Sequence, residues 1–504
     1  MTRVVADSVR SSSGTDRREP FAVVAVAVVA AVTAVVAAAA ATRYGYYYDE
    51  LYFIAAGRRP SFGYVDQGPF VPLVARAMDW VFPGSFVALR IPAVAASVGV
   101  VVFGAVIARE LGGGRGAQVV TAAACATSVL VLGQATTLST NGIDTVLWVV
   151  LTWLLVRWVR TRQDGLLLAA GVVTAVDVQV KWLVPVFWIA VIIGAGVVGP
   201  RDLLRRPALW WGAGIALLAA TPGLIWQARH GWPQLSMGSV VRRQTGGFAG
   251  SLWFVPSTLE LWGLLGAVVV VCGVWQLLRS PGFRPYRFLG VAFLLVIAVF
   301  AVSGGRTVYG AGCYPVVIAA GSVGLAASAR RWPAMAAIPA VVVSALAVVY
   351  FATPWRPASQ FSPSSDRAVT LGPSVYSELG WSELDAVTVD AYRRLWPRQR
   401  PTAVIVTEWY VQAAALDHDR TNLPPVFSPN RGFGYFGAPP DTAETIIYVG
   451  GTEADLSHWF TSVVPAGRME NPLGIPGITR DITIWECGGP KQPWSVMWPT
   501  MRKL

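Results

Sequence analysis

Residues 21–52 read FAVVAVAVVAAVTAVVAAAAATRYGYYYDELY, a long apolar run that passes directly into an aromatic and acidic one. An apolar run of about 20 residues has the length of a helix that crosses a bilayer. Residues 21–42 are therefore predicted to be a transmembrane helix. This run is too long for a cleaved signal peptide and no clean cleavage site follows it, so we expect the helix to be retained.

The composition extends this conclusion to the whole chain. Of 504 residues, 54% are hydrophobic and 13% are charged, about half the charged share of an ordinary soluble domain. Apolar runs of spanning length recur along the sequence, which excludes a soluble protein. The net charge of +12 could suggest a nucleic-acid partner. However, the arginines stand in small groups between apolar runs, which favours membrane topology as their explanation.

Run length predicts about eleven transmembrane spans. They lie at roughly 21–42, 91–111, 117–134, 142–160, 165–181, 182–199, 208–228, 257–278, 287–303, 308–328 and 333–353.

The basic residues predict the orientation of these spans. With a cytoplasmic N-terminus, alternate connections hold Arg109 and Arg115, then Arg157, Arg160 and Arg162, then Arg201, Arg205 and Arg206, then Arg279, Arg284 and Arg287, and finally Arg330 and Arg331. The intervening connections contain few basic residues. This alternation follows the positive-inside rule and places everything after about residue 354 outside. The protein is therefore expected in the plasma (cell) membrane as a multi-pass protein.

The domain prediction divides the chain into three regions. Residues 1–20 are expected to form a disordered cytoplasmic tail. Residues 21–353 are expected to form the membrane domain, with a long outer loop at 43–90 that includes an amphipathic helix at Phe70–Trp80. Residues 354–504 change to a polar, proline-rich composition and are long enough for a small separate domain. The fold class is thus an α-helical polytopic membrane protein with a small C-terminal extracytoplasmic α/β domain.

The C-terminal domain shows short buried-strand patterns that alternate with helical ones. The strands are predicted at Ala403–Thr407, Thr445–Val449 and Ile482–Trp485, and the helices at Ser382–Trp396 and Glu408–Asp417. This alternation predicts a small α/β unit.

The candidate chemistry begins with the adjacent acids Asp49 and Glu50 at the outer end of the first helix. Two carboxylates there suit proton abstraction, metal binding or contacts to sugar hydroxyls. The alternative is a solvated helix cap. Neighbouring tyrosines favour a sugar site, and Asp66 with Gln67 adds a third acid in a turn.

Further polar residues lie in the other outer connections. Asn141 and Asp144 start a span, where Asp144 could simply complement the helix dipole. Lys181 lies between two apolar runs, where it could form an i,i+4 ion pair with Asp177 or bind a lipid phosphate.

The remaining candidates lie on the same predicted face. Arg306, near Tyr309, suits bidentate phosphate contact. His230 stands in a tryptophan-rich patch that could be an interfacial belt. Because all these residues share one face of the membrane, they predict a site open to both water and lipid.

At these residues the sequence resembles the polytopic glycosyltransferases of the GT-C class, similar to the family 39-like protein O-mannosyltransferases and lipid A aminoarabinose transferase. The resemblance covers roughly residues 40–330. It rests on Asp49-Glu50-Leu51-Tyr52, Gly63-Tyr64-Val65-Asp66-Gln67, Thr140-Asn141-Gly142-Ile143-Asp144, Lys181-Trp182, Trp226-Gln227, His230-Gly231-Trp232-Pro233, Gly305-Arg306, Tyr309 and Tyr314-Pro315. The soluble tail resembles those of actinobacterial members.

The resemblance implies an inverting transferase that moves a hexosyl or pentosyl group from a polyprenyl-phosphate donor to an extracytoplasmic glycan, glycolipid or protein. It makes Asp49 the general base, with Glu50 positioning the acceptor or base. Lys181 and Arg306 would stabilise the departing phosphate. Asp66 or Asp144 would assist. Gln67, Asn141, Trp182, His230 and Tyr309 join the substrate-binding set.

The resemblance implies a divalent cation (Mg, Mn or Ca) only where the enzyme uses one, held by Asp66 or Asp144, or by Asp49 together with Asp144. The family's second acidic motif often begins with Asp, and this chain has Asn141 there, which weakens the case for a metal.

Two other functions remain open. One is a transporter or flippase for lipid-linked sugars, although no clear internal repeat supports it and the acids lie at the rim instead of the bilayer midplane. The other is a catalytically inactive relative whose soluble tail binds a glycan or a partner enzyme.

Overall fold

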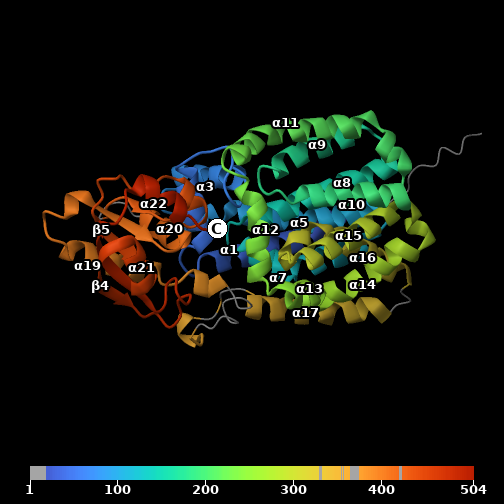
Figure 1. The fold of residues 1–504 in the computed structure, drawn as a ribbon. Helices are drawn as coiled ribbons and strands as arrows, with labels where there is room; N and C mark the ends of the chain where they lie inside the picture. The colour runs from blue at the N-terminus through green and yellow to red at the C-terminus, as the bar shows by residue number, and fades with distance from the viewer. Residues whose placement is uncertain (1–18, 329–331, 353–354, 356, 364–373, 419–422) are drawn as a thin grey trace, which may run out of the picture.

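The structure is a computed structural model that describes residues 19–328, 332–352, 355, 357–363, 374–418 and 423–504. A bundle of apolar helices forms one part of the molecule, and a smaller α/β domain covers one end of it (Figure 1). The tail predicted at 1–20 lies, apart from its last two residues, outside the described residues, as do Arg330, Arg331 and residues 353–354 at the predicted domain boundary.

The bundle and the segments at its ends contain the following helices: α1 (Val23–Ala41), α2 (Tyr48–Gly57), α3 (Phe70–Val81), α4 (Phe86–Leu89), α5 (Ile91–Glu110), α6 (Arg115–Ala126), α7 (Val129–Ala135), α8 (Thr140–Thr161), α9 (Gly165–Asp177), α10 (Val184–Val197), η1 (Arg201–Arg205), α11 (Pro207–Arg229), α12 (Pro233–Gln244), α13 (Gly247–Leu261), α14 (Gly263–Arg279), η2 (Pro281–Tyr286), α15 (Arg287–Ser303), η3 (Thr307–Cys313), α16 (Tyr314–Ser328) and α17 (Trp332–Ala352).

Several of these helices have the length and composition of membrane spans. Within the described residues, six apolar segments are long enough to cross a bilayer. Two bent helix pairs are also long and apolar enough when each pair is taken as one span. Three shorter apolar helices lie at Gly165–Asp177, Val184–Val197 and Val341–Tyr350. The prediction of a polytopic helical membrane protein is therefore confirmed. The number of eleven spans stays a prediction.

Two predicted spans are broken helices. The span predicted at 257–278 is wrong as a single helix, because the axis turns by 112° between Gly250–Leu261 and Gly263–Arg279. Gly263 has a φ of +71°, a left-handed conformation that ends a helix and that glycine adopts without a steric cost. The span predicted at 117–134 bends by 62° between α6 and α7. There the Ser128 hydroxyl accepts a hydrogen bond from the Val131 N–H and starts a new helix.

Glycines allow close contacts between helices α9 and α11. A Cβ added to Gly171 would lie 2.3 Å from the Gly212 Cα, and one added to Gly212 would lie 2.9 Å from the Leu167 carbonyl oxygen. Small residues that bring backbones together stabilise helix pairs in a bilayer, where apolar burial alone gives little driving force. These two glycines therefore set the distance between α9 and α11.

The C-terminal domain contains a five-stranded sheet flanked by helices. Its elements are η4 (Ala358–Gln360), η5 (Ser374–Ser377), α19 (Trp381–Arg394), η6 (Arg400–Thr402), β1 (Ala403–Thr407), α20 (Tyr410–His418), β2 (Val426–Phe427), η7 (Arg431–Tyr435), β3 (Thr445–Val449), α21 (Glu453–Trp459), β4 (Phe460–Met469), β5 (Ile482–Pro490) and α22 (Trp494–Met501). The predicted strands at 403–407 and 445–449 and the predicted helices are confirmed, while β5 extends five residues beyond the predicted strand end at Trp485.

The sheet order is β2-β1-β3-β5-β4, with β1 parallel to β2 and β3, and β5 antiparallel to β3 and β4. Alternate residues of the central strands pack into two different hydrophobic cores, one on each face of the sheet. Ile405 and Ile447 pack with residues of α19 and α20, whereas Val406 and Tyr448 pack with residues of α22. The sheet is therefore covered on both sides, as expected for strands that are buried along their whole length.

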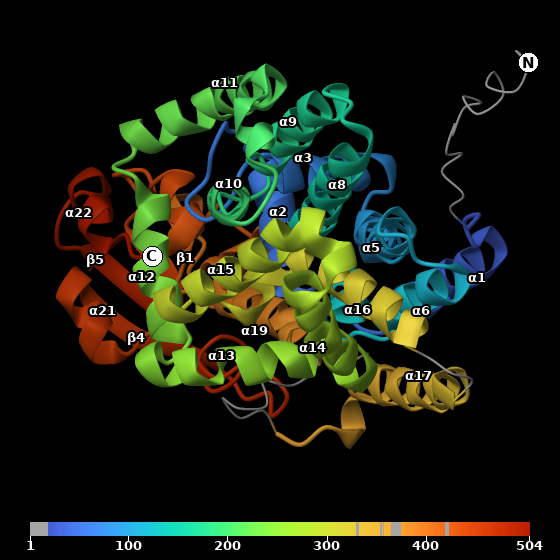
Figure 2. The same ribbon diagram turned by 90° about the vertical axis from the view of Figure 1, so that its right-hand side faces the viewer.

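The α/β domain is joined to the bundle through the loop that follows α1. Residues of α2 and α3 share one hydrophobic cluster with residues of α20 and the sheet, among them Leu51, Val71 and Val411. The Arg59 guanidinium donates two hydrogen bonds of 2.8 Å to the Asp417 carboxylate. Figures 1 and 2 show α12 crossing the same end of the bundle beside this domain.

The glycine contact between α9 and α11 leads to a stability prediction. Gly171→Ala is expected to lower the free energy of unfolding by about 1–3 kcal/mol, because the new methyl group overpacks the contact. The measurement is thermal unfolding in a mild detergent. Gly214→Ala on α11 is the control, since a Cβ there meets no atom within 4 Å. Equal unfolding temperatures for the two variants would contradict the prediction.

Candidate active site

The polar residues predicted from sequence gather at the end of the bundle that carries the α/β domain. α2 and the loop after it bring Asp49 and Asp66, the start of α8 brings Asn141 and Asp144, and Lys181 lies in the turn between α9 and α10. Arg306 directly precedes η3. Segments distant in the sequence therefore meet in one region, which we call the acidic site.

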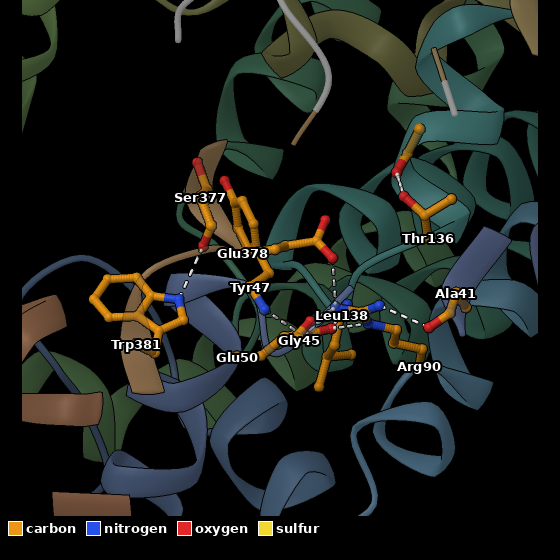
Figure 3. A network of polar contacts seen from close by, with 11 residues as sticks. Ala41, Gly45, Tyr47, Glu50, Arg90, Thr136, Leu138, Ser377, Glu378 and Trp381 are labelled. Carbon is orange, nitrogen blue, oxygen red and sulfur yellow. Dashed lines mark hydrogen bonds and ion pairs between the residues drawn. The ribbon is translucent and has the colours of Figure 1, made fainter. Parts of the chain in front are cut away.

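The first turn of α2 is fixed by a buried ion pair (Figure 3). The Arg90 Nε and Nη2 each donate to one carboxylate oxygen of Glu50, both at 2.9 Å. Arg90 also donates to the carbonyl oxygens of Ala41 at 2.7 Å and Gly45 at 2.8 Å, and to Glu378 at 3.3 Å. Arg90 is 1% exposed and Glu50 is 0% exposed, so this network excludes water.

Backbone donors complete the surroundings of Glu50. The N–H groups of Tyr47 and Leu138 donate to its two oxygens at 2.9 and 2.8 Å. The contact with Tyr47 closes the first turn of α2 as a capping box does. Glu50 therefore holds α2, the start of α5 and the segment before α8 together.

Asp49, the adjacent residue, points toward the C-terminal domain. The Tyr410 hydroxyl of α20 donates to Asp49 Oδ1 at 2.8 Å. Burial raises the pKa of Asp49 above its ordinary value, while the Tyr410 hydroxyl and the charge of Arg431 act to lower that pKa. A carboxylate with a raised pKa at the rim of a membrane domain is suited to accept a proton.

Asp66 lies near Asp49. It accepts a hydrogen bond of 3.1 Å from the Tyr52 hydroxyl. Burial raises the pKa of Asp66 as well, and the charge of Arg431 opposes this rise. The neighbouring Gln67 is 2% exposed, and within the described part of the chain its amide has no hydrogen-bond partner.

Lys181 lies beside the start of α8. Its ammonium group donates to Asn141 Oδ1 at 2.6 Å and lies 4.3 Å from the centroid of the Tyr309 ring. Among the described residues it forms no salt bridge with Asp177 within 4.0 Å, so the alternative of an i,i+4 ion pair is wrong. Asn141 and Tyr309 thus hold the Lys181 ammonium group in place.

Asp144 lies deeper in the bundle, next to Asp177. The two carboxyl groups interact with each other and with Trp148, and they are 3% and 0% exposed. The positive charge of Lys181 acts on both carboxyl groups.

Arg306 and His230 lie nearer the surface. The Arg306 guanidinium donates to Gln244 Oε1 of α12 at 3.0 Å, and its charge acts on Asp49 and Tyr48. The exposed His230 ring stacks on Trp226 at 4.1 Å and lies 5.9 Å from Tyr435 of the C-terminal domain. His230 is therefore part of an aromatic stack at the edge of the site.

Two cavities adjoin the site at Trp182. An apolar cavity of about 380 Å³ lies between α9, α10 and α11 and includes Val178, Trp188 and Ala216 in its lining. A small polar cavity of about 10 Å³ is lined by Gln67, Gln179, Gln227 and Gln234. Val178, Trp182 and Ala220 line both cavities, so the apolar space among the helices and the polar pocket at the bundle end share a wall.

The residues at the site do not assemble a metal centre. Among the described residues, no group of three or more His, Cys, Asp or Glu side chains is placed to hold a metal ion. Asp144 is engaged with Asp177 and not with Asp49. Hard divalent cations such as Mg²⁺ and Ca²⁺ prefer sets of oxygen ligands, and Asp49 and Asp144 do not provide such a set.

The sequence patterns missed three residues that shape the site: Arg90, Tyr410 and Arg431. Arg90 directly precedes the span predicted at 91–111 and could have been noticed as a charge next to an apolar run. Tyr410 and Arg431 lie in the C-terminal domain, and the Arg431 Nη1 donates to the Tyr410 hydroxyl at 3.2 Å. Nothing in the local sequence pairs either of them with Asp49.

Comparisons with known proteins agree with this architecture. The family model described as dolichyl-phosphate-mannose-protein mannosyltransferase matches residues 66–226, less than half of the chain. Two crystal structures of ArnT from Cupriavidus metallidurans, one bound to undecaprenyl phosphate and one in the apo state, give TM-scores of 0.61 and 0.60 at 14% and 13% identity. Each covers 92% of this chain, with 97% and 98% of the ArnT chain covered.

The chain has the GT-C fold.

An oligosaccharyltransferase of Archaeoglobus fulgidus is also similar, with a TM-score of 0.46 at 14% identity over 83% of this chain and 67% of that chain. No curated protein sequence matches the chain. The two ArnT structures and the family model confirm the resemblance to the GT-C class at the level of the fold. Because one fold hosts different reactions, the activity has to be argued from the acidic site.

The buried network of Arg90 leads to a second prediction. Arg90→Met is expected to lower the free energy of unfolding by about 3–5 kcal/mol, because it leaves the Glu50 carboxylate buried without its cation. The measurement is thermal or denaturant unfolding in detergent.

The matched control is Arg394→Met, whose partner Asp390 is exposed. Loss of an exposed ion pair is expected to change the stability by about 1 kcal/mol or less. An Arg90→Met protein as stable as Arg394→Met would show that the GT-C fold of this chain does not depend on the buried pair.

Proposed function

We propose that the protein is an inverting glycosyltransferase that moves a sugar from a polyprenyl-phosphate donor to an extracytoplasmic acceptor, with Asp49 as general base. The observation that carries this proposal is the convergence of Asp49 with Lys181 and Arg306 at one end of a GT-C fold. Asp49 and Asp66 supply negative charge, and the two cations stand beside them.

The reaction follows from these charges. Asp49 takes the proton of an acceptor hydroxyl as its oxygen attacks the anomeric carbon from the side opposite the phosphate. The new bond joins the acceptor oxygen to that carbon. The bond from the carbon to the phosphate oxygen breaks, and the phosphate leaves on its lipid with the electron pair. Displacement from the opposite side inverts the anomeric configuration, as in other inverting transfers.

Lys181 and Arg306 are proposed to stabilise the phosphate that leaves. Both are cations, and each is held by a neutral side-chain amide oxygen, of Asn141 and Gln244 respectively. Neither forms an ion pair within the described residues, so each charge stays available to an anion. Arginine suits bidentate contact with phosphate, and lysine acts as a point charge.

The apolar cavity beside Trp182 is proposed to take isoprenoid units of the donor. It lies among the apolar helices α9, α10 and α11 and is lined by Trp182, the residue after Lys181, so a lipid there would hold its phosphate near this cation. The ArnT structure with undecaprenyl phosphate supports a polyprenyl-phosphate ligand for this fold.

The other predicted residues are assigned supporting roles. Glu50 positions the first turn of α2 and so the carboxylate of Asp49. Asp66 and the buried amide of Gln67 face the sugar or the acceptor. His230 and Trp226 offer aromatic faces on which a sugar ring can stack. Asp144, on which the charge of Lys181 acts, has an assisting role.

The positive-inside pattern of the basic residues favours a site on the outer side of the plasma membrane. We therefore propose a cytoplasmic N-terminus and an extracytoplasmic C-terminal domain. The acceptor is a cell-envelope glycan, a glycolipid or a protein, which reaches the site from the aqueous side.

The reaction is tested with a panel of radiolabelled polyprenyl-phosphate sugars in membranes that contain matched amounts of protein. Wild type is expected to transfer one sugar, and Asp49→Asn is expected to reduce transfer by about 10²- to 10⁴-fold, the range for loss of a general base. Asp390→Asn, at an exposed position of the C-terminal domain, is the control and is expected to keep full activity.

Three other outcomes would contradict parts of the proposal. Transfer that survives Asp49→Asn would remove Asp49 as the base. Movement of the intact lipid-linked sugar across the bilayer without transfer would favour a flippase. Binding of glycan with no turnover of any donor would indicate an inactive relative.

The orientation is tested by cysteine labelling in intact cells. With Cys272 replaced by serine, the native cysteines that remain are buried. A membrane-impermeant maleimide is expected to label Ser457→Cys, at an exposed position of the C-terminal domain, without permeabilisation. Gln163→Cys, exposed between α8 and α9 at the other end of α8, is expected to react only after permeabilisation. The reverse pattern would overturn the proposed topology.

A further inference from the structure

The C-terminal domain reaches into the acidic site through α20 and η7. The Tyr410 ring packs edge-on against Tyr52 of α2, with ring centroids 5.0 Å apart. Gly432 lies so close to Tyr52 that a Cβ there would be 1.9 Å from the Tyr52 hydroxyl oxygen. Only glycine permits this approach, so the domain is fitted against the helix that carries Asp49.

Two side chains of this domain form a chain of contacts that ends on Asp49. The Arg431 Nη1 donates to the Tyr410 hydroxyl at 3.2 Å, and that hydroxyl donates to Asp49 Oδ1 at 2.8 Å. The Arg431 guanidinium also lies 4.9 Å from the centroid of the Tyr410 ring. Among the described residues, Asp49 Oδ2 makes no hydrogen bond, so one oxygen is fixed and the other is left for a substrate.

The backbone at Arg431 is held in an uncommon conformation. Its φ is +45°, in the left-handed region that residues other than glycine seldom adopt. The Arg431 N–H donates to the Lys503 carbonyl oxygen at 2.8 Å, and the Lys503 N–H donates to Pro429 at 3.0 Å. Strained backbone persists where surrounding contacts hold it and is concentrated at functional sites.

We propose that Tyr410 and Arg431 are positioning residues for the general base: Tyr410 fixes the rotamer of Asp49, and Arg431 is the counter-ion shared by Asp49 and Asp66. This inference rests on the proposed function of Asp49. It assigns the C-terminal domain a direct part in the reaction, since the base is oriented and kept ionised only while that domain is docked.

The electrostatics around Asp49 explain why such partners are needed. Burial raises the pKa of Asp49, and the neighbouring charge of Asp66 raises that pKa further. Tyr47 and Tyr48 on the same helix provide no positive charge. The groups that favour the ionised form face Asp49 from other elements: Tyr410 on α20, Arg431 on η7 and Arg306 before η3. Two of these three belong to the C-terminal domain.

The test uses Tyr410→Phe in the full-length protein, reconstituted in nanodiscs. An infrared pH titration follows the carboxylic-acid band that is absent from Asp49→Asn. A hydroxyl that donates to a carboxylate stabilises its ionised form, so removing it is expected to raise the pKa of Asp49 by about one unit or more. In the transfer assay, the acid limb of kcat/KM is expected to move to higher pH by the same amount, with kcat lowered and the KM for donor little changed.

Arg431 provides a second, independent variant. Arg431→Gln removes the shared positive charge and is expected to shift the Asp49 band in the same direction. Arg431→Lys keeps the charge and is expected to restore most of the wild-type titration. Tyr448→Phe is the control, because Tyr448 is a buried tyrosine of β3 that packs against Phe460 in a different core.

The outcomes separate this inference from the proposed function. Loss of transfer in Asp49→Asn, together with wild-type titrations and pH profiles in Tyr410→Phe and Arg431→Gln, would overturn the inference alone. Transfer that survives Asp49→Asn would overturn the role of Asp49 and the inference with it. Equal shifts in Arg431→Lys and Arg431→Gln would show that packing, and not charge, is the contribution of Arg431, which would overturn its role as counter-ion.

Discussion

The buried ion pair between Arg90 and Glu50 is the interaction on which the rest of the site depends. One guanidinium contacts the end of α1, the first turn of α2 and Glu378 near α19 while it starts α5. In a region shielded from water, every donor of an arginine has to find an acceptor. The carboxylate and carbonyl partners of Arg90 satisfy this condition only in one arrangement of these segments. The direction of α2, and with it the place of Asp49, follows from that arrangement.

Much of the fold could be predicted from sequence because its signals are local. Apolar run length located most of the helices, and the helix predicted at Phe70–Trp80 is α3. The central strands β1 and β3 have the predicted bounds, since a run of buried β-branched residues between turns is distinctive. The break at Gly263 was missed because apolar composition continues across it. Hydropathy measures whether a segment is apolar and carries no information on a single left-handed residue within it.

The site was predicted less completely. Asp49, Lys181 and Arg306 stand out as charges near the ends of apolar runs and Asp66 as an acid in a turn of the outer loop, and the structure brings them together. The roles of these residues stay predictions. Tyr410 and Arg431 could not be found in the same way, because each lies in an ordinary polar segment and its contact with α2 spans most of the chain. Long-range packing of this kind is set by the shape of two surfaces, and a single sequence does not display it.

The close fit of Gly432 on Tyr52 has a consequence for how this architecture can diversify. In many multidomain proteins, an appended domain can be exchanged through its linker while the rest of the chain stays unchanged. Here side chains of the two parts bind each other across the boundary. Tyr410 of the C-terminal domain donates to Asp49 of α2, and Arg59 pairs with Asp417. A chimaera that takes its C-terminal domain from a relative would need α2, α20 and η7 from the same parent. Because the two parts fit together at this interface, the residues on its two sides are expected to change together in evolution.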